Sequence, residues 1–176
     1  MAGTRKECIQ NGEVCHGLFM VSSNSKASGD APWYEASSQS MVDTYSGYID
    51  IVAFESKVEP RLIRAIMFME TTHGYYDAPL NWVGKNKSIL PMNINVEYWG
   101  NTFGTREEMQ DPLKNIRAGA EMLRRIVGNI PTGSSVEQIA TLYNNINATT
   151  VNNYGMRVKK IYDDKPWTEM SVPGFE

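Results

Sequence analysis

Glu70 stands where a carboxyl group could do acid–base chemistry, near the end of an apolar segment that begins at Pro60. Proline suits the first turn of a helix, because the N–H that it lacks would be unpaired there. Ile63, Ile66 and Met67 recur at helical spacing, and the next position on that face is the glutamate. The opposite face is also apolar, so the spacing predicts a buried helix with a carboxyl group near its end.

A carboxyl group in that position is costly to ionise, since burial raises its pKa. The helix is expected to end at Gly74, and the carboxyl group could stay protonated in a cleft near neutral pH. A general acid for the cleavage of a glycosidic bond has this form. The alternative is structural: Glu70 turns outward, or pairs with an arginine or a backbone N–H. The helix by itself leaves both interpretations open.

Further helices must surround this segment if it is buried. Apolar spacing predicts a helix over residues 38–57, whose inner face is Tyr45, Tyr48, Ile49, Val52 and Ala53. A second helix is expected to begin at Asp111–Pro112, which are a good N-cap and first-turn pair. A third follows Ser134, which with Glu137 is typical of a capping box. The last carries Val151, Tyr154, Val158, Ile161 and Tyr162.

The helix after Pro112 has an apolar stripe of Ile116, Ala120, Leu123, Val127 and Ile130. Gly119 costs helix propensity, and its benefit is a close approach, for which the central helix is the expected partner. Arg117, Arg124 and Arg125 are expected to form a solvated face.

Residues 75–100 lose the helical pattern, and a short strand pair is expected near Ile89. Aromatic residues gather in this segment, namely Tyr75, Tyr76, Trp82, Tyr98 and Trp99. Loops that carry rings and amides on a helical scaffold are common binding sites, and such groups suit sugars. A satellite hydrophobic cluster under a long loop explains the same residues equally well.

Tyr143 lies at the inner end of its helix, as Glu70 does on the central one. A phenol can donate a hydrogen bond to a buried carboxyl group. A core tyrosine with its hydroxyl at the surface explains the spacing equally well.

The composition describes one globular domain of 176 residues, with 41% apolar residues and nine tyrosines. The net charge of -3, without a basic run, speaks against a nucleic-acid binder, and no run reaches membrane-spanning length. No signal peptide is visible. Cys8 and Cys15 could form a local disulfide or remain free thiols, and with His16 they make a poor metal site, so no metal or cofactor is expected.

Three parts are expected along the chain: an irregular arm over residues 1–36, a helical domain over 37–165 and an extended tail over 166–176. Trp33 and Tyr34 are expected to pin the arm to the helical domain.

Four stretches, in this order, resemble the lysozyme-like lytic transglycosylases of the soluble type, with goose-type lysozymes as more distant relatives. Met67–Thr71 matches a helix that ends in Glu-Ser in the family, and Leu90–Ile94 matches the motif Gly-Leu-Met-Gln-Ile. Asp111–Leu123 contains the family's Asp-Pro, Asn-Ile and Ala-Gly-Ala in that order. Ala140–Asn144 matches Ala-x-Tyr-Asn, and Val158–Tyr162 matches the helix that follows it. The resemblance covers about residues 41–163. Thr71 keeps the hydroxyl of the family's Ser, and Asn93 keeps the amide of its Gln, whereas Leu90–Pro91 and Asn145–Ile146 depart from the pattern.

The resemblance implies a mainly α, lysozyme-like domain with a central buried helix and a small irregular or β segment beside a cleft. It implies that Glu70 protonates the β-1,4 bond between N-acetylmuramic acid and N-acetylglucosamine of peptidoglycan. The same residue would then act as base on the muramic 6-hydroxyl group, and the acetamido group would assist. The substrate-binding residues that it implies are Tyr143, which would position Glu70, and Asn144, Met92, Asn93, Thr71 and Tyr154.

Two other functions stay open. A hydrolysing muramidase would need a base to activate water, for which Asp77 and Glu97 are the candidates, and His73 is left out of the catalytic set. A non-catalytic module that binds peptidoglycan or anchors a secretion complex is the second alternative. Without a visible signal, the class analogy indicates a secreted or periplasm-acting antibacterial effector, whose partner would be an immunity protein that plugs the cleft.

Overall fold

The computed structural model describes residues 8–10, 13–15, 19–31, 33–72, 88–99 and 102–168. Its helices are α1 (Ala36–Thr44), α2 (Ser46–Ser56), α3 (Pro60–Glu70), α4 (Val96–Trp99), α5 (Pro112–Gly128), α6 (Val136–Asn144) and α7 (Asn153–Asp164). Two short antiparallel pairs accompany them, β1 (Cys8–Gln10) with β2 (Glu13–Cys15) and β3 (Ser88–Ile89) with β4 (Ile94–Asn95). The prediction of a mainly α protein is confirmed.

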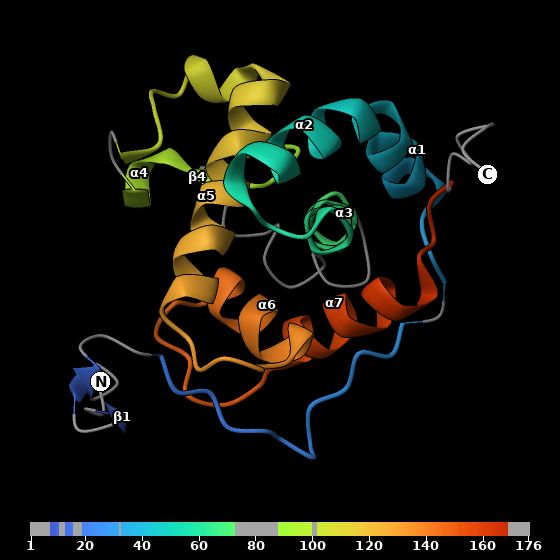
Figure 1. The fold of residues 1–176 in the computed structure, drawn as a ribbon. Coiled ribbons are helices and arrows are strands. Elements are labelled where there is room, and N and C mark those ends of the chain that lie inside the picture. Colours follow the sequence, from blue (N-terminus) through green and yellow to red (C-terminus); the bar gives the residue numbers. More distant parts are fainter. Residues whose placement is uncertain are drawn as a thin grey trace, which may run out of the picture.

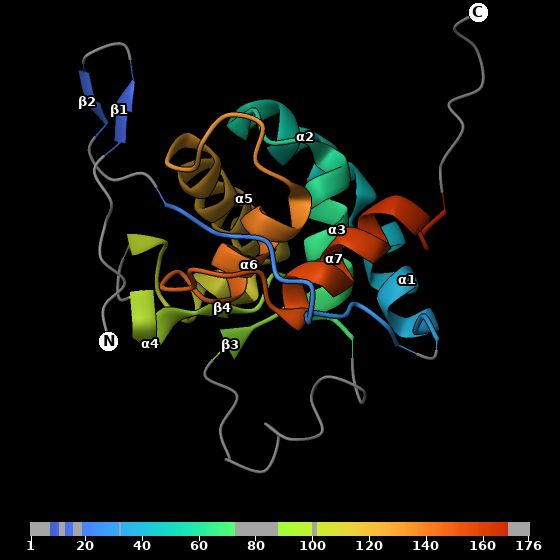
Figure 2. The same ribbon diagram turned by 90° about the horizontal axis from the view of Figure 1, so that it is seen from below.

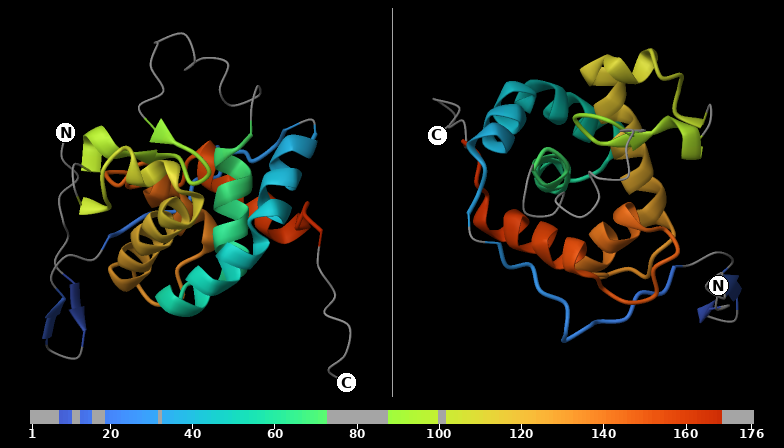
Figure 3. Two further views of the ribbon diagram at one scale, coloured as in Figure 1. Left: turned by 90° about the horizontal axis from the view of Figure 1, so that it is seen from above. Right: turned by 180° about the vertical axis from the view of Figure 1, so that it is seen from behind.

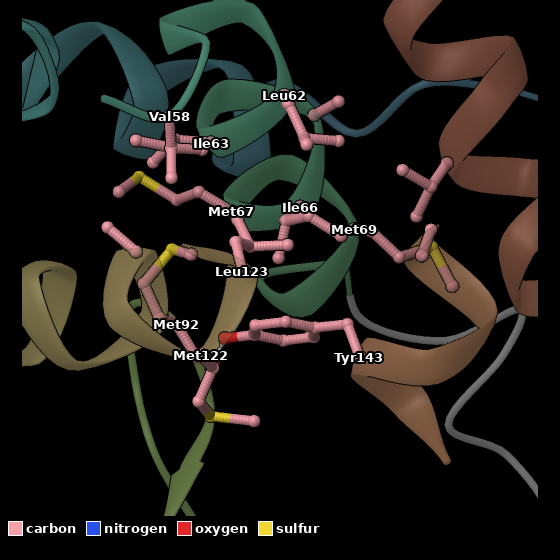
Figure 4. Close-up of a cluster of buried hydrophobic side chains, with 14 of the residues drawn as sticks. Val58, Leu62, Ile63, Ile66, Met67, Met69, Met92, Met122, Leu123 and Tyr143 are labelled. Atoms are coloured by element: carbon pink, nitrogen blue, oxygen red, sulfur yellow. Dashed lines mark hydrogen bonds between the residues drawn. The ribbon is translucent and has the colours of Figure 1, made fainter. Parts of the chain in front are cut away.

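Helix α3 is central, and Figure 1 looks along its axis, with α1 and α2 on one side and α6 and α7 on the other. It packs against α1, α2 and α7. Every residue from Leu62 to Met69 is buried except Arg64. Figure 4 shows Ile63, Ile66 and Met67 in one buried cluster with side chains of neighbouring elements. Each such side chain stabilises the fold by about 1.5–3 kcal/mol, so the apolar faces of α3 fix where Glu70 emerges.

The end of α3 comes earlier than Gly74, which lies outside the described residues. The hydroxyl of Thr71 donates to the carbonyl oxygen of Met67 at 2.8 Å, and the hydroxyl of Thr72 donates to that of Phe68 at 2.9 Å. The Met67 carbonyl also accepts the Thr71 N–H at 3.0 Å, so it is the Phe68 carbonyl to which the threonine hydroxyls give a partner that a helix end would lack. The helix therefore stops at Glu70 without a glycine.

The predicted helix over residues 38–57 is two helices, which meet at Tyr45. Ser46 and Gly47 follow the break, and neither favours a helix interior as alanine would. Ile49, Val52 and Ala53 are buried as predicted, whereas Tyr48 is 43% exposed and was placed on the wrong face.

The strand pair predicted near Ile89 is the β3–β4 hairpin, which lies beside α5 (Figure 3). Asn115 of α5 is fully buried and holds this hairpin. Its side-chain oxygen accepts from the Met92 N–H at 2.8 Å, and its amide donates to the carbonyl oxygens of Ile89 and Met109 at 2.8 and 3.1 Å. One side chain thus replaces backbone pairing at the turn between the two strands.

Gly119 of α5 allows a close approach, but its partner is Met92 and not the central helix. A Cβ atom at Gly119 would lie 2.7 Å from the terminal methyl group of Met92 and 2.8 Å from its Cβ atom. The prediction of a helix–helix contact was wrong because the hairpin turn lies against this part of α5. Val127 was also misplaced in the apolar stripe, since it is 46% exposed.

Helix starts follow the sequence closely. Asp111 caps α5 by accepting from the N–H groups of Leu113 and Lys114. The capping box of α6 exists one residue later than predicted, formed by Ser135 and Gln138. The shift leaves the buried face of α6 unchanged, because Ala140 and Tyr143 remain inside.

Residues 19–35 run along α6, α7 and the loop between them, as Figure 2 shows for the blue segment. Ser22 forms a bridge with Thr150, and Asn24 donates to the carbonyl oxygen of Val151 at 2.9 Å. Tyr34 packs edge-on against Phe68 at 5.7 Å between ring centroids, as predicted, whereas Trp33 is 60% exposed. The β1–β2 register places Cys8 opposite Cys15.

Arg157 of α7 is buried, at 3% exposure, and holds the N-terminal segment at Gly29 and Trp33. Its guanidinium group donates to the carbonyl oxygens of Gly29 at 3.3 Å and Trp33 at 3.1 Å, and it lies over the ring of Tyr34. Trp167 is buried after the end of α7, so the chain stays packed beyond residue 166. Among the described residues, no helix has the length and apolar character needed to cross a membrane.

Candidate functional site

The carboxyl group of Glu70 is held from two directions at the end of α3. The side-chain amide of Asn93 donates to Oε2 at 2.6 Å, and the hydroxyl of Tyr154 donates to Oε1. Glu70 itself is only partly buried, although the residues before it, from Ala65 to Met69, are all buried. The three side chains come from α3, the hairpin turn and α7, so tertiary packing assembles this group.

Asn93 reaches Glu70 because of an unusual backbone conformation. Its φ angle is +57°, in the left-handed region that asparagine tolerates better than most residues. Its side chain is exposed and lies in the wall of the cavity described below. Asparagine is therefore a residue that fits this turn.

Two tyrosines lie beside the carboxyl group, and each has a different hydrogen-bond partner. Tyr143 donates to the carbonyl oxygen of Met92 at 2.8 Å, and Figure 4 shows its hydroxyl among the labelled core residues. The hydrogen bond to Glu70 that the sequence left open for Tyr143, and that the resemblance implied for it, is made by Tyr154. Burial, together with the nearby charge of Glu70, raises the pKa of both phenols well above its ordinary value. Both therefore remain protonated donors at neutral pH.

A cavity of about 340 Å³ opens in front of Glu70. Its described wall consists of Glu70, Asn93, Asn95, Trp99, Met122, Tyr143, Asn144, Asn145, Ile146 and Asn147. Five asparagine side chains offer both donors and acceptors, and one indole ring offers a flat apolar surface. This combination suits a neutral polar ligand that carries hydroxyl and amide groups and an apolar face.

Two predicted substrate contacts need correction. The Met92 side chain is fully buried against α5, so it supports the hairpin from behind and does not line the cavity. Thr71 is 2% exposed, and its hydroxyl is used by the carbonyl groups of α3. Both residues shape the backbone around Glu70. The other predicted residues Tyr143, Asn144 and Asn93 line the cavity, and Tyr154 contacts Glu70.

The sequence reasoning missed the loop that follows α6. Asn145, Ile146 and Asn147 line the cavity, and the backbone N–H of Asn147 bonds to the side chain of Asn145 at 3.1 Å. The run of asparagines was a usable signal, since amides beside a predicted groove residue favour ligand contact. Asn95 and Met122 were missed because only the tertiary fold brings them to this wall.

Several predicted residues cannot be placed. His73, Asp77, Tyr75, Tyr76 and Trp82 lie outside the described residues, as does the side chain of Glu97. Among the residues that are described, no group of three His, Cys, Asp or Glu side chains could hold a metal ion.

Comparison of the chain with models of known protein families, with curated proteins and with solved structures gives no match.

Proposed function

We propose that this protein cleaves the β-1,4 bond between N-acetylmuramic acid and N-acetylglucosamine in peptidoglycan, with Glu70 as its acid and base. The observation that carries the proposal is the placement of Glu70, held by Asn93 and Tyr154 at the wall of an asparagine-lined cavity. A purely structural carboxylate at a helix end would not need a cavity in front of it. The proposal includes a lysozyme-like arrangement of the helices around α3.

In the first step, protonated Glu70 gives its proton to the glycosidic oxygen as the bond to C1 breaks. The acetamido oxygen of the muramic residue bonds to C1 and holds the positive charge that develops there. In the second step, the carboxylate takes the proton of the 6-hydroxyl group, whose oxygen attacks C1 and releases the acetamido group. The product has a 1,6-anhydro end, and Glu70 is protonated again.

Substrate must compete with Asn93 for Oε2 of Glu70. Because the Asn93 side chain is exposed on the cavity side, its amide can turn from the carboxyl group to a sugar acetamido group. The hydroxyl of Tyr154 donates to the other oxygen, Oε1, and keeps the carboxyl group in place. Oε2 of Glu70 would thus be offered to the glycosidic oxygen when substrate displaces the Asn93 amide.

The single-acid route and hydrolysis require different groups in the cavity. Within the described part of the cavity wall, Glu70 is the one carboxylate. A hydrolysing muramidase would need a second carboxylate to activate water, about 6.5–9.5 Å from the first in the inverting case. Asp77 and the Glu97 side chain, the sequence candidates for that base, lie outside the described residues.

The test is mass spectrometry of soluble products released from purified peptidoglycan sacculi by the wild type and by Glu70→Gln. Glutamine keeps the size and one carbonyl oxygen of the glutamate side chain but has no acidic proton to give. Products with 1,6-anhydro ends that disappear with Glu70→Gln would support the proposal. Products with reducing muramic ends would make the protein a muramidase, and no products from folded wild type would leave a binding module.

A further inference from the structure

A second cavity, of about 190 Å³, lies against the Glu70 cavity. Trp99, Met122 and Ile146 line both, so the two cavities share a wall. This second cavity is formed where the end of α4 meets α5 and the loop after α6. None of its residues was singled out by the family motifs as a substrate contact.

Its walls are chemically different from those of the Glu70 cavity. Phe19, Phe103 and Ile126 line it beside a single asparagine, Asn129, among the described residues. The Phe103 ring meets the Trp99 ring edge-on at 5.4 Å between centroids. Apolar side chains in protein interiors normally close such space, because cores pack as densely as organic crystals. The cavity has the volume of about six water molecules, which is room for one or two small aliphatic groups.

One end of the cavity is positively charged. The guanidinium group of Arg125 lies 5.4 Å from the centroid of the Phe103 ring and is half exposed. It shares the carboxylate of Glu121 with Arg124, at 2.8 and 2.7 Å. Two guanidinium groups therefore meet one carboxylate, which leaves one positive charge uncompensated within this group of three. An apolar ligand with a carboxylate at its end fits these walls and this charge.

We infer that this cavity binds the aliphatic, carboxylate-ended part of a peptide branch on the glycan strand, with Arg125 receiving the carboxylate. The inference rests on the proposed function, because the strand in the Glu70 cavity is what carries the branch. The shared wall of Trp99, Met122 and Ile146 is the reason to place strand and branch in adjacent cavities. The protein would thus prefer strands that still carry their peptides.

The test compares soluble glycan strands that keep their peptide branches with the same strands after the branches are removed. Binding is measured at equilibrium with the Glu70→Gln protein, so that no strand is cut. We expect about fivefold tighter binding of the branched strands, since one partly exposed charge-assisted hydrogen bond is added. Adding Arg125→Gln should remove that preference.

Arg117→Gln is the matched control, because Arg117 is on the same helix but bonds to Glu55, and it does not line the cavity. It should keep the preference for branched strands, and thermal unfolding of both variants would show that each is folded. Equal affinity for both strands, or equal behaviour of the two arginine variants, would overturn the inference and leave the proposed function standing. A protein that binds neither strand would overturn both.

Discussion

The hydroxyl of Tyr154 on α7 donates a hydrogen bond to the carboxyl group of Glu70 on α3. The two residues are 84 positions apart in sequence, and α7 runs across the direction of α3 and packs against it (Figure 1). This bond connects the geometry of the candidate acid to the docking of a separate helix. It makes Tyr154 a positioning residue whose effect on Glu70 can be measured.

Tyr154→Phe should lower kcat by about tenfold, the value of one hydrogen bond of about 1.4 kcal/mol, with little change in KM. The ring still packs, but the carboxyl group loses the donor that orients it. Steady-state kinetics on soluble glycan strands measure the two parameters separately. Tyr162→Phe is the control, because Tyr162 is on the same helix and donates to Glu59 at 2.7 Å, away from the cavity wall. A Tyr154 variant with the same kcat as this control would contradict the role.

Gly119→Ala should destabilise the protein by about 1–3 kcal/mol, the usual cost of overpacking a core. The added methyl group would lie within 3 Å of three atoms of Met92, the residue before Asn93. Activity should fall as well, because the turn that carries Asn93 must move. Chemical denaturation gives the free energy of unfolding.

The same change at Gly128 provides the comparison for Gly119. A Cβ atom at Gly128 meets nothing within 4 Å, although it belongs to the same helix. Gly128→Ala should therefore be neutral or raise stability by up to about 1 kcal/mol. If both alanines had the same effect, the close approach of Met92 would not be the cause.

Asn115→Ala should reduce the free energy of unfolding by about 3 kcal/mol, because it leaves the buried Met92 N–H and two carbonyl groups without their partner. The β3–β4 hairpin should then exchange its amide hydrogens faster, which hydrogen exchange can follow. Asn129→Ala serves for comparison, since that amide bonds only to an exposed carbonyl group of Arg125 on the same helix. A loss no greater than that of the comparison variant would argue against Asn115 as the anchor of the hairpin.

The carboxylate of Glu121 should make the free energy of unfolding depend on pH in the acid range. The guanidinium groups of Arg124 and then Arg125 lower its pKa from 4.5 to about 2. Because the folded pKa lies below the unfolded one, the contribution is complete above about pH 4.5 and is lost as the pH falls toward 2. The side chain is 31% exposed, so we expect less than about 1 kcal/mol.

The measurement for Glu121 is the Tm difference between the wild type and Glu121→Gln at several pH values. The wild type should be more stable at pH 6, and the difference should shrink between pH 4.5 and pH 2. A difference that stays constant over this range would show that the carboxylate charge is not what stabilises this pair of arginines.

Local signals in the sequence predicted the helices well and their ends less well. Pro60 and Asp111 start helices where expected, because capping depends on residues within one turn. The break at Tyr45 and the early end of α3 were missed, since each depends on packing or side-chain bonds that compete with a helical pattern. Val127 and Tyr48 were assigned to inner faces because spacing alone does not show which side of a helix has a neighbour.

The sequence by itself determined that Glu70 would come near the end of a buried helix, because seven of the eight residues from Leu62 to Met69 are apolar and Arg64 is the exception. Only the tertiary structure decided what the carboxyl group meets. Tyr154 and not Tyr143 donates to it, Met92 turns inward, and the asparagines after α6 face the cavity. These choices depend on the relative placement of α3, α7 and the hairpin, which is set by buried contacts between residues far apart in the chain.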